Sequence, residues 1–482
     1  MTLLIIDIGS SSTRAMLFDE HAQLIDDAQR TVRYRFDTTA DGGAAIDPLF
    51  LREQVETCVS SLLAHPQAGQ VRAVAVASFV GNLMGLDAAG VPRTPIYTYA
   101  DTRGGDEADF LKQQIDPAHI HQRTGCRIHT AYWPVRIRWL QRTQPDTWRQ
   151  VVRWVDFATY LYRCWFGIEQ CTYSAASWSG MLNRDALDWE PQWLSLLDLP
   201  LEKLPRLVDY DHSLSGLLPE YAQRWPILRH VPFFSAVGDG AAANIGSGCV
   251  DATRVALTLG TTGALRTVIA GSTPMIPLGL WSYRVNTLHH LVGGATTEGG
   301  SIVVWSRELF QIDRDAVEAA LAGALPDGHG LTFLPLLAGE RSPGWNPEAS
   351  GTLYGLRLAT TPLEIVQAGV EGVAFRLAAV FDQLRPLLYP DVQIIAGGGA
   401  IRGSAAWTQI IADALDTPLH VSAEAEVTGR GMAILALHTL DHVALSVFPP
   451  VVSHTVTPRP FAVERYKAAR LRQQALYERL YN

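Results

Sequence analysis

The chain has 482 residues, of which 48% are hydrophobic and 18% are charged, and its formal net charge is −9. This length predicts two large domains, because a single hydrophobic core seldom extends beyond about 250–300 residues. The acidic balance argues against a general nucleic-acid-binding protein, which is usually basic, so no nucleic-acid partner is expected.

The N-terminal apolar run, "LLIIDIG" at residues 3–9, predicts a buried strand rather than an export signal. No positive cluster precedes it, and Asp7 interrupts it too early for a signal peptide. The longest apolar stretch, residues 73–86, contains Asn82 and is too short to cross a bilayer. The five cysteines form no CxxC pair, which favours reduced thiols over a disulfide framework or a zinc site. We therefore expect a soluble, cytoplasmic protein with no membrane partner.

Strands and helices alternate along the next part of the chain. Residues 13–25 are expected to form a strand that turns back on itself. Residues 47–65 have apolar side chains at helical spacing, with Asp47 as the N-cap and Pro48 at the first helical position. Residues 71–79, "VRAVAVASF", form a further buried strand. This alternation predicts an α/β architecture with largely parallel central sheets.

The segment 133–225 differs from the rest in composition. It contains nine of the 13 tryptophans and little strand pattern, and a helix is expected within residues 145–167, ending at Gly167. This aromatic density fits either a sugar-stacking surface or a helical insertion with a bulky core. The second interpretation is favoured, because most buried tryptophans are packing residues.

Two hairpins of similar sequence indicate an internal duplication. Residues 255–269, "VALTLGTTGALRTVI", repeat the plan of residues 3–18, "LLIIDIGSSSTRAMLF". Each has an apolar strand, a bend at Gly9 or Gly260, small hydroxyl residues, a basic residue and a second apolar strand. One such turn is a common hairpin. Two of them, each near the start of one half of the chain, predict a duplicated domain.

The residues at these bends are typical of phosphate binding. Glycine and small hydroxyl side chains let backbone N–H groups and hydroxyls approach an anion closely. Asp7, at a strand end, is placed to hold a hydrated Mg²⁺, although such a carboxylate also commonly caps a turn. Arg14 adds positive charge. Two facing hairpins would hold one polyphosphate between them, with contacts from Ser10, Ser11, Ser12, Gly260, Thr261 and Thr262.

A third glycine-rich turn, Gly397–Gly399, joins the strand "VQIIA" to a helix that begins near Ser404. Residues 414–421 do not supply the acidic ribose anchor of a dinucleotide fold. The turn instead fits an adenosine site in which bare backbone lies against the base.

Five segments together resemble the FGGY carbohydrate kinases, and among these the gluconokinases. They are "DIGSSSTR" (7–14), "GDGAAANIGSG" (238–248), "LTLGTTGALRTV" (257–268), "FLPLLAGERSPGWNPEASGTLYGL" (333–356) and "AGGGAIRGSAAWTQIIAD" (396–413). The resemblance implies two actin-like domains of the ribonuclease-H type with an ATP cleft between them. The first, residues 1–247, would bind the sugar and carry the insertion, and the second, residues 248–482, would bind the nucleotide.

The same resemblance implies the site residues of an ATP- and Mg²⁺-dependent sugar kinase. Asp239 would be the base that takes the proton of the substrate hydroxyl, although "GDG" alone is more often a turn. D-gluconate, converted to 6-phosphogluconate, would be the first choice of substrate. The nucleotide would be lined by Gly300, Gly398, Gly399 and, less directly, Gly403.

The expected sugar site contains Asp101 and Arg103, which match the family's acidic and arginine pair near the sugar. Together they would suit an aldonate, whereas the structural alternative is an ion pair near a turn. Gly81 and Asn82 stand where gluconokinase-like chains usually carry Met-His, and Asn82 is retained as a candidate substrate contact. Arg136 replaces a lysine that is usual in the family.

Alternatives remain at the level of function. A xylulose-type ketose or a polyol is the second choice of substrate, and a non-catalytic actin-like ATPase or sugar-binding protein is the alternative class. Only a kinase needs Asp239 as a base. An ion pair of Glu340 with Arg341 or a neighbour is expected to hold a loop, with no part in catalysis. Residues 460–481 have apolar side chains at helical spacing, at Phe461, Tyr466, Ala469 and Leu476, which most simply fits a helix docked on the second domain and is also compatible with a homodimer contact.

Overall fold

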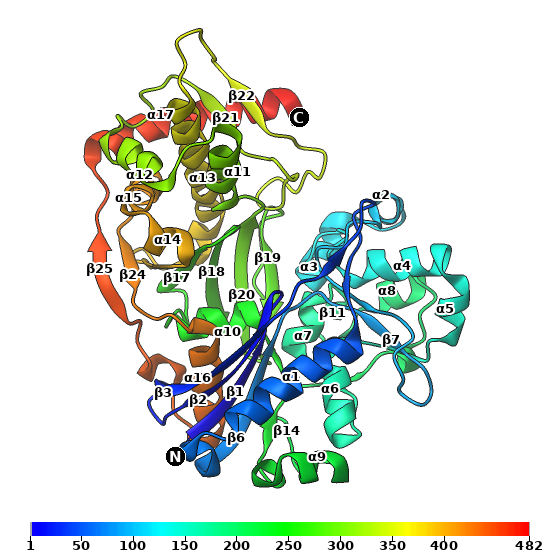
Figure 1. Cartoon of the computed structure of the whole chain (residues 1–482). Coiled ribbons are helices and arrows are strands. Elements are labelled where there is room, and N and C mark those ends of the chain that lie inside the picture. The colour runs from blue at the N-terminus through cyan, green and yellow to red at the C-terminus, as the bar shows by residue number, and fades with distance from the viewer. Residues whose placement is uncertain (1, 482) are drawn as a thin grey trace.

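Two seven-stranded sheets, one in each half of the chain, organise the fold (Figure 1). The structure is a computed structural model that describes residues 2–481. Among these residues, every helix is too short or too polar to cross a membrane. The first sheet has the order β14-β15-β6-β1-β2-β3, with β16 also paired to β6, and the second has the order β19-β20-β18-β17-β23-β24-β25.

The strands of the first sheet are β1 (Thr2–Ile8), β2 (Ser12–Phe18), β3 (Leu24–Arg33), β6 (Val71–Ser78), β14 (Ser213–Leu214), β15 (Phe233–Phe234) and β16 (Val237–Gly238). Those of the second are β17 (Arg254–Leu259), β18 (Gly263–Ala270), β19 (Trp281–Arg284), β20 (His289–Thr296), β23 (Gln393–Gly397), β24 (Leu419–Ser422) and β25 (Val452–Val456). Small sheets contain β4 (Asp37–Thr38), β5 (Ala44–Ile46), β7 (Met84–Leu86), β8 (Ile96–Tyr97), β9 (Arg153–Val155), β10 (Gln170–Thr172), β11 (Leu182–Asn183), β12 (Asp188–Trp189), β13 (Arg206–Val208), β21 (Thr332–Leu334) and β22 (Thr352–Tyr354).

The helices of the first half are α1 (Pro48–Leu62), α2 (Gly105–Gln114), α3 (Pro117–Thr124), α4 (Trp133–Thr143), α5 (Pro145–Gln150), α6 (Phe157–Phe166), α7 (Tyr173–Trp178), α8 (Pro191–Leu196), α9 (Pro219–Arg224) and α10 (Asp239–Gly246). Those of the second half are α11 (Ser301–Phe310), α12 (Arg314–Gly323), α13 (Pro362–Leu384), α14 (Gly399–Gly403), α15 (Ala405–Leu415), α16 (Val427–Asp441) and α17 (Pro460–Tyr481). Short 3₁₀ helices are η1 (Pro66–Gln70), η2 (Leu201–Lys203), η3 (Pro226–Leu228), η4 (Arg385–Leu387) and η5 (Leu445–Val447).

The two sheets share one strand plan, which confirms the internal duplication. β1 pairs antiparallel with β2 and parallel with β6, and β2 pairs antiparallel with β3. In the second half, β17 pairs in the same way with β18 and β23, and β18 pairs with β20. The expectation of largely parallel sheets was wrong, because each hairpin adds antiparallel strands beside the parallel ones.

Local sequence signals explain several helix ends. The side chain of Asp47 accepts a hydrogen bond from the N–H of Phe50 at 2.7 Å, which caps α1 as expected. Helix α15 begins after Ser404, whose hydroxyl oxygen accepts the N–H of Trp407 at 3.0 Å. Helix α6 ends at Gly167, which takes the left-handed conformation (φ 72°).

The helix expected within residues 145–167 is interrupted. Residues 153–155 instead form β9, which pairs antiparallel with β7. Asp156 then starts α6 anew by accepting the N–H of Thr159 at 2.9 Å. The β-branched and aromatic residues that precede Asp156 favour a strand when a partner is available, so tertiary pairing overrode the helical pattern.

The tryptophan-rich segment 133–225 mixes short helices with short strands, so it is less helical than expected. Its aromatic residues nevertheless form a core. The side chains of Trp133, Trp154, Trp165 and Trp225 are fully buried. The packing interpretation of these tryptophans is therefore confirmed.

Helix α17 packs on the second half, as the apolar spacing predicted. Tyr466 and Ala469 are buried, and the Tyr466 hydroxyl donates to Glu371 of α13 at 3.0 Å. Phe461, which the same pattern placed in the core, is 54% exposed.

The two halves interlock through α16. This helix belongs to the second half of the chain but packs on β1 and β6 of the first sheet and against α10. One hydrophobic cluster accordingly joins Ile5 and Ala241 of the first half to Val268 and Met432 of the second.

Candidate active site

Asp7 and Asp239 lie at the same edge of the first sheet. Asp7 of β1 is in register with Ala77 of β6, and Val237 of β16 is in register with the same Ala77 from the other side. All three strands are parallel, so their carboxyl ends meet at one edge, and Asp239 follows β16 directly as the first residue of α10. Such an edge is the usual place for ligands in an α/β sheet.

Asp7 is buried within a group of charged side chains. Arg14 Nη1 lies 3.0 Å from Asp7 Oδ2 and 3.6 Å from Glu426 Oε2. Burial raises the pKa of Asp7 to about 7, although the positive charge of Arg14 opposes this shift. The charges of Asp239 and Glu426 raise this pKa further. Glu426 carried no sequence signal, because it reaches the site from the distant segment just before α16.

Asp239 is half-buried, and desolvation of its carboxyl group raises its pKa to about 6. The Gly240 N–H, which donates to Asp239 Oδ1 at 2.7 Å, and the charge of Arg266 oppose the shift. A carboxylate with a pKa near 6 is ionised at neutral pH yet basic enough to accept a proton during a reaction.

The first hairpin has the tight bend that the sequence predicts. The Gly9 N–H donates to the Ser12 carbonyl at 2.9 Å, and the Tyr34 hydroxyl donates to the Gly9 carbonyl at 2.7 Å. Ser11 is exposed and Ser10 half-buried, whereas Ser12 is buried. The hydroxyls of Ser10 and Ser11 are therefore the more accessible ones.

The second hairpin and the glycine-rich turns of the second half come together. The Gly260 carbonyl accepts the Gly300 N–H at 2.6 Å. Gly398 has φ +101°, and a Cβ there would lie 2.4 Å from the Leu259 carbonyl, so only glycine fits. Thr261 and Thr262 are exposed at the bend.

Gly399 presents its backbone, without a side chain, next to the glycine-rich turn. A Cβ at Gly399 would meet nothing within 4 Å, so the space beside it is open. Gly403 is the last residue of the short helix α14, and its carbonyl accepts Arg314 Nη2 at 2.6 Å. The structure thus gathers the candidate nucleotide residues of the second half around one open surface.

Asp101 and Arg103 form one ion pair. Arg103 Nη2 lies 2.6 Å from Asp101 Oδ2, Arg103 Nε donates to Oδ1 at 3.1 Å, and the Ala44 N–H donates to Oδ2 at 3.3 Å. The guanidinium also lies over the ring of Trp139, 4.4 Å from its centre. The pair is therefore organised within the first half.

Arg136 connects backbone segments close to the Asp101–Arg103 ion pair. It is 3% exposed, and it donates to the carbonyls of Gly81 at 2.9 Å and Thr98 at 2.6 Å. Burial lowers the pKa of Arg136 to about 10, and the nearby charge of Asp101 opposes this shift.

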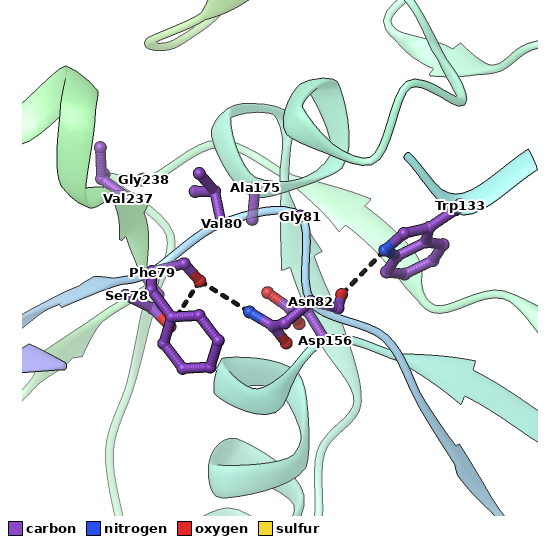
Figure 2. A pocket seen from close by; sticks show the side chains of 11 residues that line it. Ser78, Phe79, Val80, Gly81, Asn82, Trp133, Asp156, Ala175, Val237 and Gly238 are labelled. Atoms are coloured by element: carbon purple, nitrogen blue, oxygen red, sulfur yellow. Dashed lines mark hydrogen bonds between the residues drawn. The ribbon is translucent and has the colours of Figure 1, made fainter. Parts of the chain in front are cut away.

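Asn82 is engaged within the protein, which weakens its candidacy as a substrate contact (Figure 2). Its Nδ2 donates to the Phe79 carbonyl at 2.6 Å, and its Oδ1 accepts the Phe157 N–H at 2.7 Å. Its backbone carbonyl accepts Trp133 Nε1 at 2.8 Å. Figure 2 shows the side chain turned toward Phe79 inside the hollow that Val237 and Gly238 also line.

Glu340 pairs with Arg376 of α13 and accepts the Tyr477 hydroxyl at 2.6 Å, so its partner is not Arg341. Arg341 instead donates from Nη2 to the Thr296 carbonyl at 2.9 Å. The expected loop-fixing ion pair thus exists with a more distant partner, and the charge of Arg341 acts on Arg266 and Glu298 instead.

Like Glu426, Arg266 was not predicted as a site residue from the sequence. The sequence identifies it only as the basic residue of the second hairpin. It lies on β18, and its charge acts on Asp239 across the two halves of the chain. Asp239 and Arg266 belong to different halves of the chain, so no local sequence pattern indicates that they lie near each other.

Models of two consecutive domains match the chain. "FGGY family of carbohydrate kinases, N-terminal domain" matches residues 2–246, and the C-terminal domain of the same family matches residues 255–440. The chain belongs to the FGGY family of carbohydrate kinases. It is therefore a sugar kinase, with ATP as the phosphoryl donor that this family implies, and the expected two-domain α/β fold is confirmed.

Relatives within the FGGY family differ in the sugar they are named for. Gluconokinase of Bacillus subtilis (strain 168) is 27% identical over 446 residues, which cover 90% of this chain and 86% of the relative. Xylulose kinase of Escherichia coli (strain K12) is 27% identical over 412 residues, covering 85% and 84%. The crystal structure of gluconate kinase from Lactobacillus acidophilus superposes with a TM-score of 0.92 at 24% identity, covering 100% of this chain and 98% of that one.

Proposed function

We propose that this FGGY kinase transfers the γ-phosphoryl group of ATP to D-gluconate and forms 6-phosphogluconate, with Asp239 as the base. The position of the Asp239 carboxylate, at the same sheet edge as Asp7 and with a pKa of about 6, carries this proposal. A carboxylate in this range takes the hydroxyl proton as the phosphorus–oxygen bond forms, while the bond to the ADP oxygen breaks.

The nucleotide site in this proposal uses both hairpins. Hydroxyl and N–H groups at residues 10–14 and 260–262 would bind the phosphates, and the open backbone at Gly399 would lie against the adenosine. Sugar binding would belong to residues 1–247 and nucleotide binding to residues 248–482. A cytoplasmic location fits the five free cysteines.

A magnesium ion fits the acidic side of this site. Asp7, Asp239 and Glu426 supply the carboxylate oxygens that Mg²⁺ prefers. Asp7 would hold the hydrated ion beside the phosphates. When bound, the ion would neutralise phosphate charge.

D-gluconate is favoured by the gluconokinases among the relatives, since two from Bacillus cover 90% and 96% of this chain. Asp101 and Arg103 would contact substrate hydroxyls. A xylulose-type ketose is the second candidate, because Gly81 and Asn82 replace the usual Met-His and xylulose kinase is equally identical. An actin-like ATPase or a sugar-binding protein that phosphorylates no sugar would not need Asp239 as a base for a substrate hydroxyl.

A coupled ADP-release screen with MgATP tests the proposal. D-gluconate, D-xylulose and glycerol are compared at matched concentrations, and the product is located by phosphorus NMR. The largest kcat/KM on D-gluconate with phosphorylation at the terminal hydroxyl is expected. A clear preference for D-xylulose or glycerol would show that D-gluconate is not the preferred substrate. ATP hydrolysis without formation of a phosphorylated sugar would reject the kinase mechanism.

A further inference from the structure

Arg266 is a half-buried cation beside the first turn of α10. A Cβ placed on Gly240 would lie 3.9 Å from Arg266 Nε and 3.2 Å from the ring of Trp178. The next residue but one on β18, Val268, packs in the same cluster as Ala241 of α10. Side chains alternate along a strand, so Arg266 shares this face with Val268 and extends from the second half toward Asp239.

The guanidinium of Arg266 lacks a full set of partners. Its Nε is buried and has no hydrogen-bond acceptor among the described residues. It also makes no ion pair with Asp239 within 4.0 Å among these residues, although the charges of the two groups influence each other. A buried donor without an acceptor is costly, and this cost is removed when a ligand supplies oxygen atoms.

Trp178 and Arg341 add further hydrogen-bond donors near Arg266. Trp178 Nε1 is buried without an acceptor, and it lies 2.8 Å from the position that a Cβ on Gly238 would take. The charge of Arg341 also acts on Arg266. Arg341 also acts on Glu298, so the donors left without an acceptor within residues 2–481, at Arg266 and Trp178, and not a surplus of positive charge, favour a ligand with oxygen atoms at this place.

We propose that Arg266 recognises the carboxylate of the sugar acid and so distinguishes an aldonate from a neutral sugar or polyol of the same length. This inference rests on the proposed function, because it needs the substrate to lie beside Asp239. In this arrangement the substrate hydroxyl would contact Asp239, and its acid group would contact the guanidinium of Arg266. Arg266 bears a fixed charge and a planar fork of donors, which match a carboxylate geometrically.

The test compares binding of D-gluconate with binding of D-glucitol, its neutral polyol counterpart, by titration calorimetry. The full chain is used in the presence of Mg²⁺ and a non-hydrolysable ATP analogue. Arg266→Gln is expected to weaken D-gluconate binding at least about tenfold and to change D-glucitol binding much less, as expected for the loss of a charged hydrogen bond. Arg266→Lys should restore part of the difference, because it keeps the charge and loses the fork.

Arg93→Gln is the matched control, since it removes the same charge from an exposed ion pair with Asp87. Thermal unfolding of each variant verifies that it is folded. Equal weakening of both ligands, or unchanged binding of both, would overturn the inference. A loss of kcat that is the same for every acceptor would assign Arg266 to the transferred phosphoryl group and also overturn it.

The design separates this inference from the proposed function. If wild-type protein binds D-gluconate through Arg266 but phosphorylates no acceptor, the kinase mechanism fails and the inference stands. If wild-type protein phosphorylates only neutral acceptors and does not bind D-gluconate, the inference fails together with the choice of substrate, while phosphoryl transfer stands.

Discussion

Asp239 shows how desolvation prepares a side chain for proton transfer. Removal from water disfavours the charged carboxylate and raises the pKa of Asp239 to about 6, and the Gly240 N–H and Arg266 limit the rise. The result is a group that is largely ionised at pH 7.5.

Replacement of the proposed base tests its role directly. Asp239→Asn keeps the size of the side chain and removes its ability to accept the proton. We expect kcat to fall about 10²-fold or more, the scale of lost general-base catalysis, with ATP affinity nearly unchanged. Steady-state kinetics and ATP-analogue titration measure the two effects. Near-normal turnover would remove Asp239 from the base role.

The pH dependence follows from the same carboxyl group. Because the ionised form is the active base, protonation below a pKa of about 6 should lower kcat/KM by about tenfold per pH unit, with a plateau above pH 7. The acidic limb should be absent from the residual rate of Asp239→Asn. A profile that stays flat down to pH 5 would contradict this assignment.

At the scale of elements, α10 and α16 cross at two glycines. A Cβ on Gly246 would lie 1.8 Å from the Val427 carbonyl, and a Cβ on Gly431 would lie 1.8 Å from the Ala242 carbonyl. Both obstacles are backbone atoms, which cannot rotate away. This contact fixes the position of α10, and therefore of Asp239, relative to the second half.

Gly431→Ala is expected to separate these helices. Overpacking of this kind lowers the free energy of unfolding by about 1–3 kcal/mol. Because the added Cβ meets a backbone carbonyl, we expect a loss at the upper end of this range for Gly431→Ala. Urea unfolding measures the loss. Gly323→Ala is the control, because Gly323 lies in α12 with nothing within 4 Å of the added Cβ. Equal stability of both variants and wild type would show that the helices shift freely.

At the scale of the whole molecule, histidines occupy the contact between the halves. His121 Nε2 lies 2.8 Å from the Leu280 carbonyl, and the His129 ring packs edge-on against Trp345, with 5.6 Å between the ring centres. Burial lowers the pKa of His121 to about 4 and that of His129 to about 4. Both are therefore held neutral in the folded protein.

Acidification should weaken this contact. The folded pKa of His121 lies below the unfolded value of about 6.5, so the unfolded chain takes up the proton first. Its contribution to stability is complete above pH 6.5 and is lost as the pH falls toward about 4, by roughly 1–2 kcal/mol at pH 5. Urea unfolding at pH 7.5 and pH 5 measures the loss, and His121→Gln should reduce the difference. The same difference in His121→Gln would contradict the account.

Sequence alone determined the two hairpins, the glycine-rich turns and the caps at Asp47 and Ser404. These features depend on neighbours a few residues apart, so the local pattern of apolar, small and turn residues is enough to reveal them. The order of such segments also identified the family, because each one needs particular residue types at fixed spacing.

Only the tertiary structure decided which side chains share the site. Glu426 reaches Arg14 from the far end of the chain, and Arg266 approaches Asp239 only because α10 packs against the second sheet. The side chain of Asn82, a candidate ligand by position, is instead occupied by Phe79 and Phe157. Contacts between distant segments depend on packing and hydrogen bonding of the whole molecule, which no local pattern records.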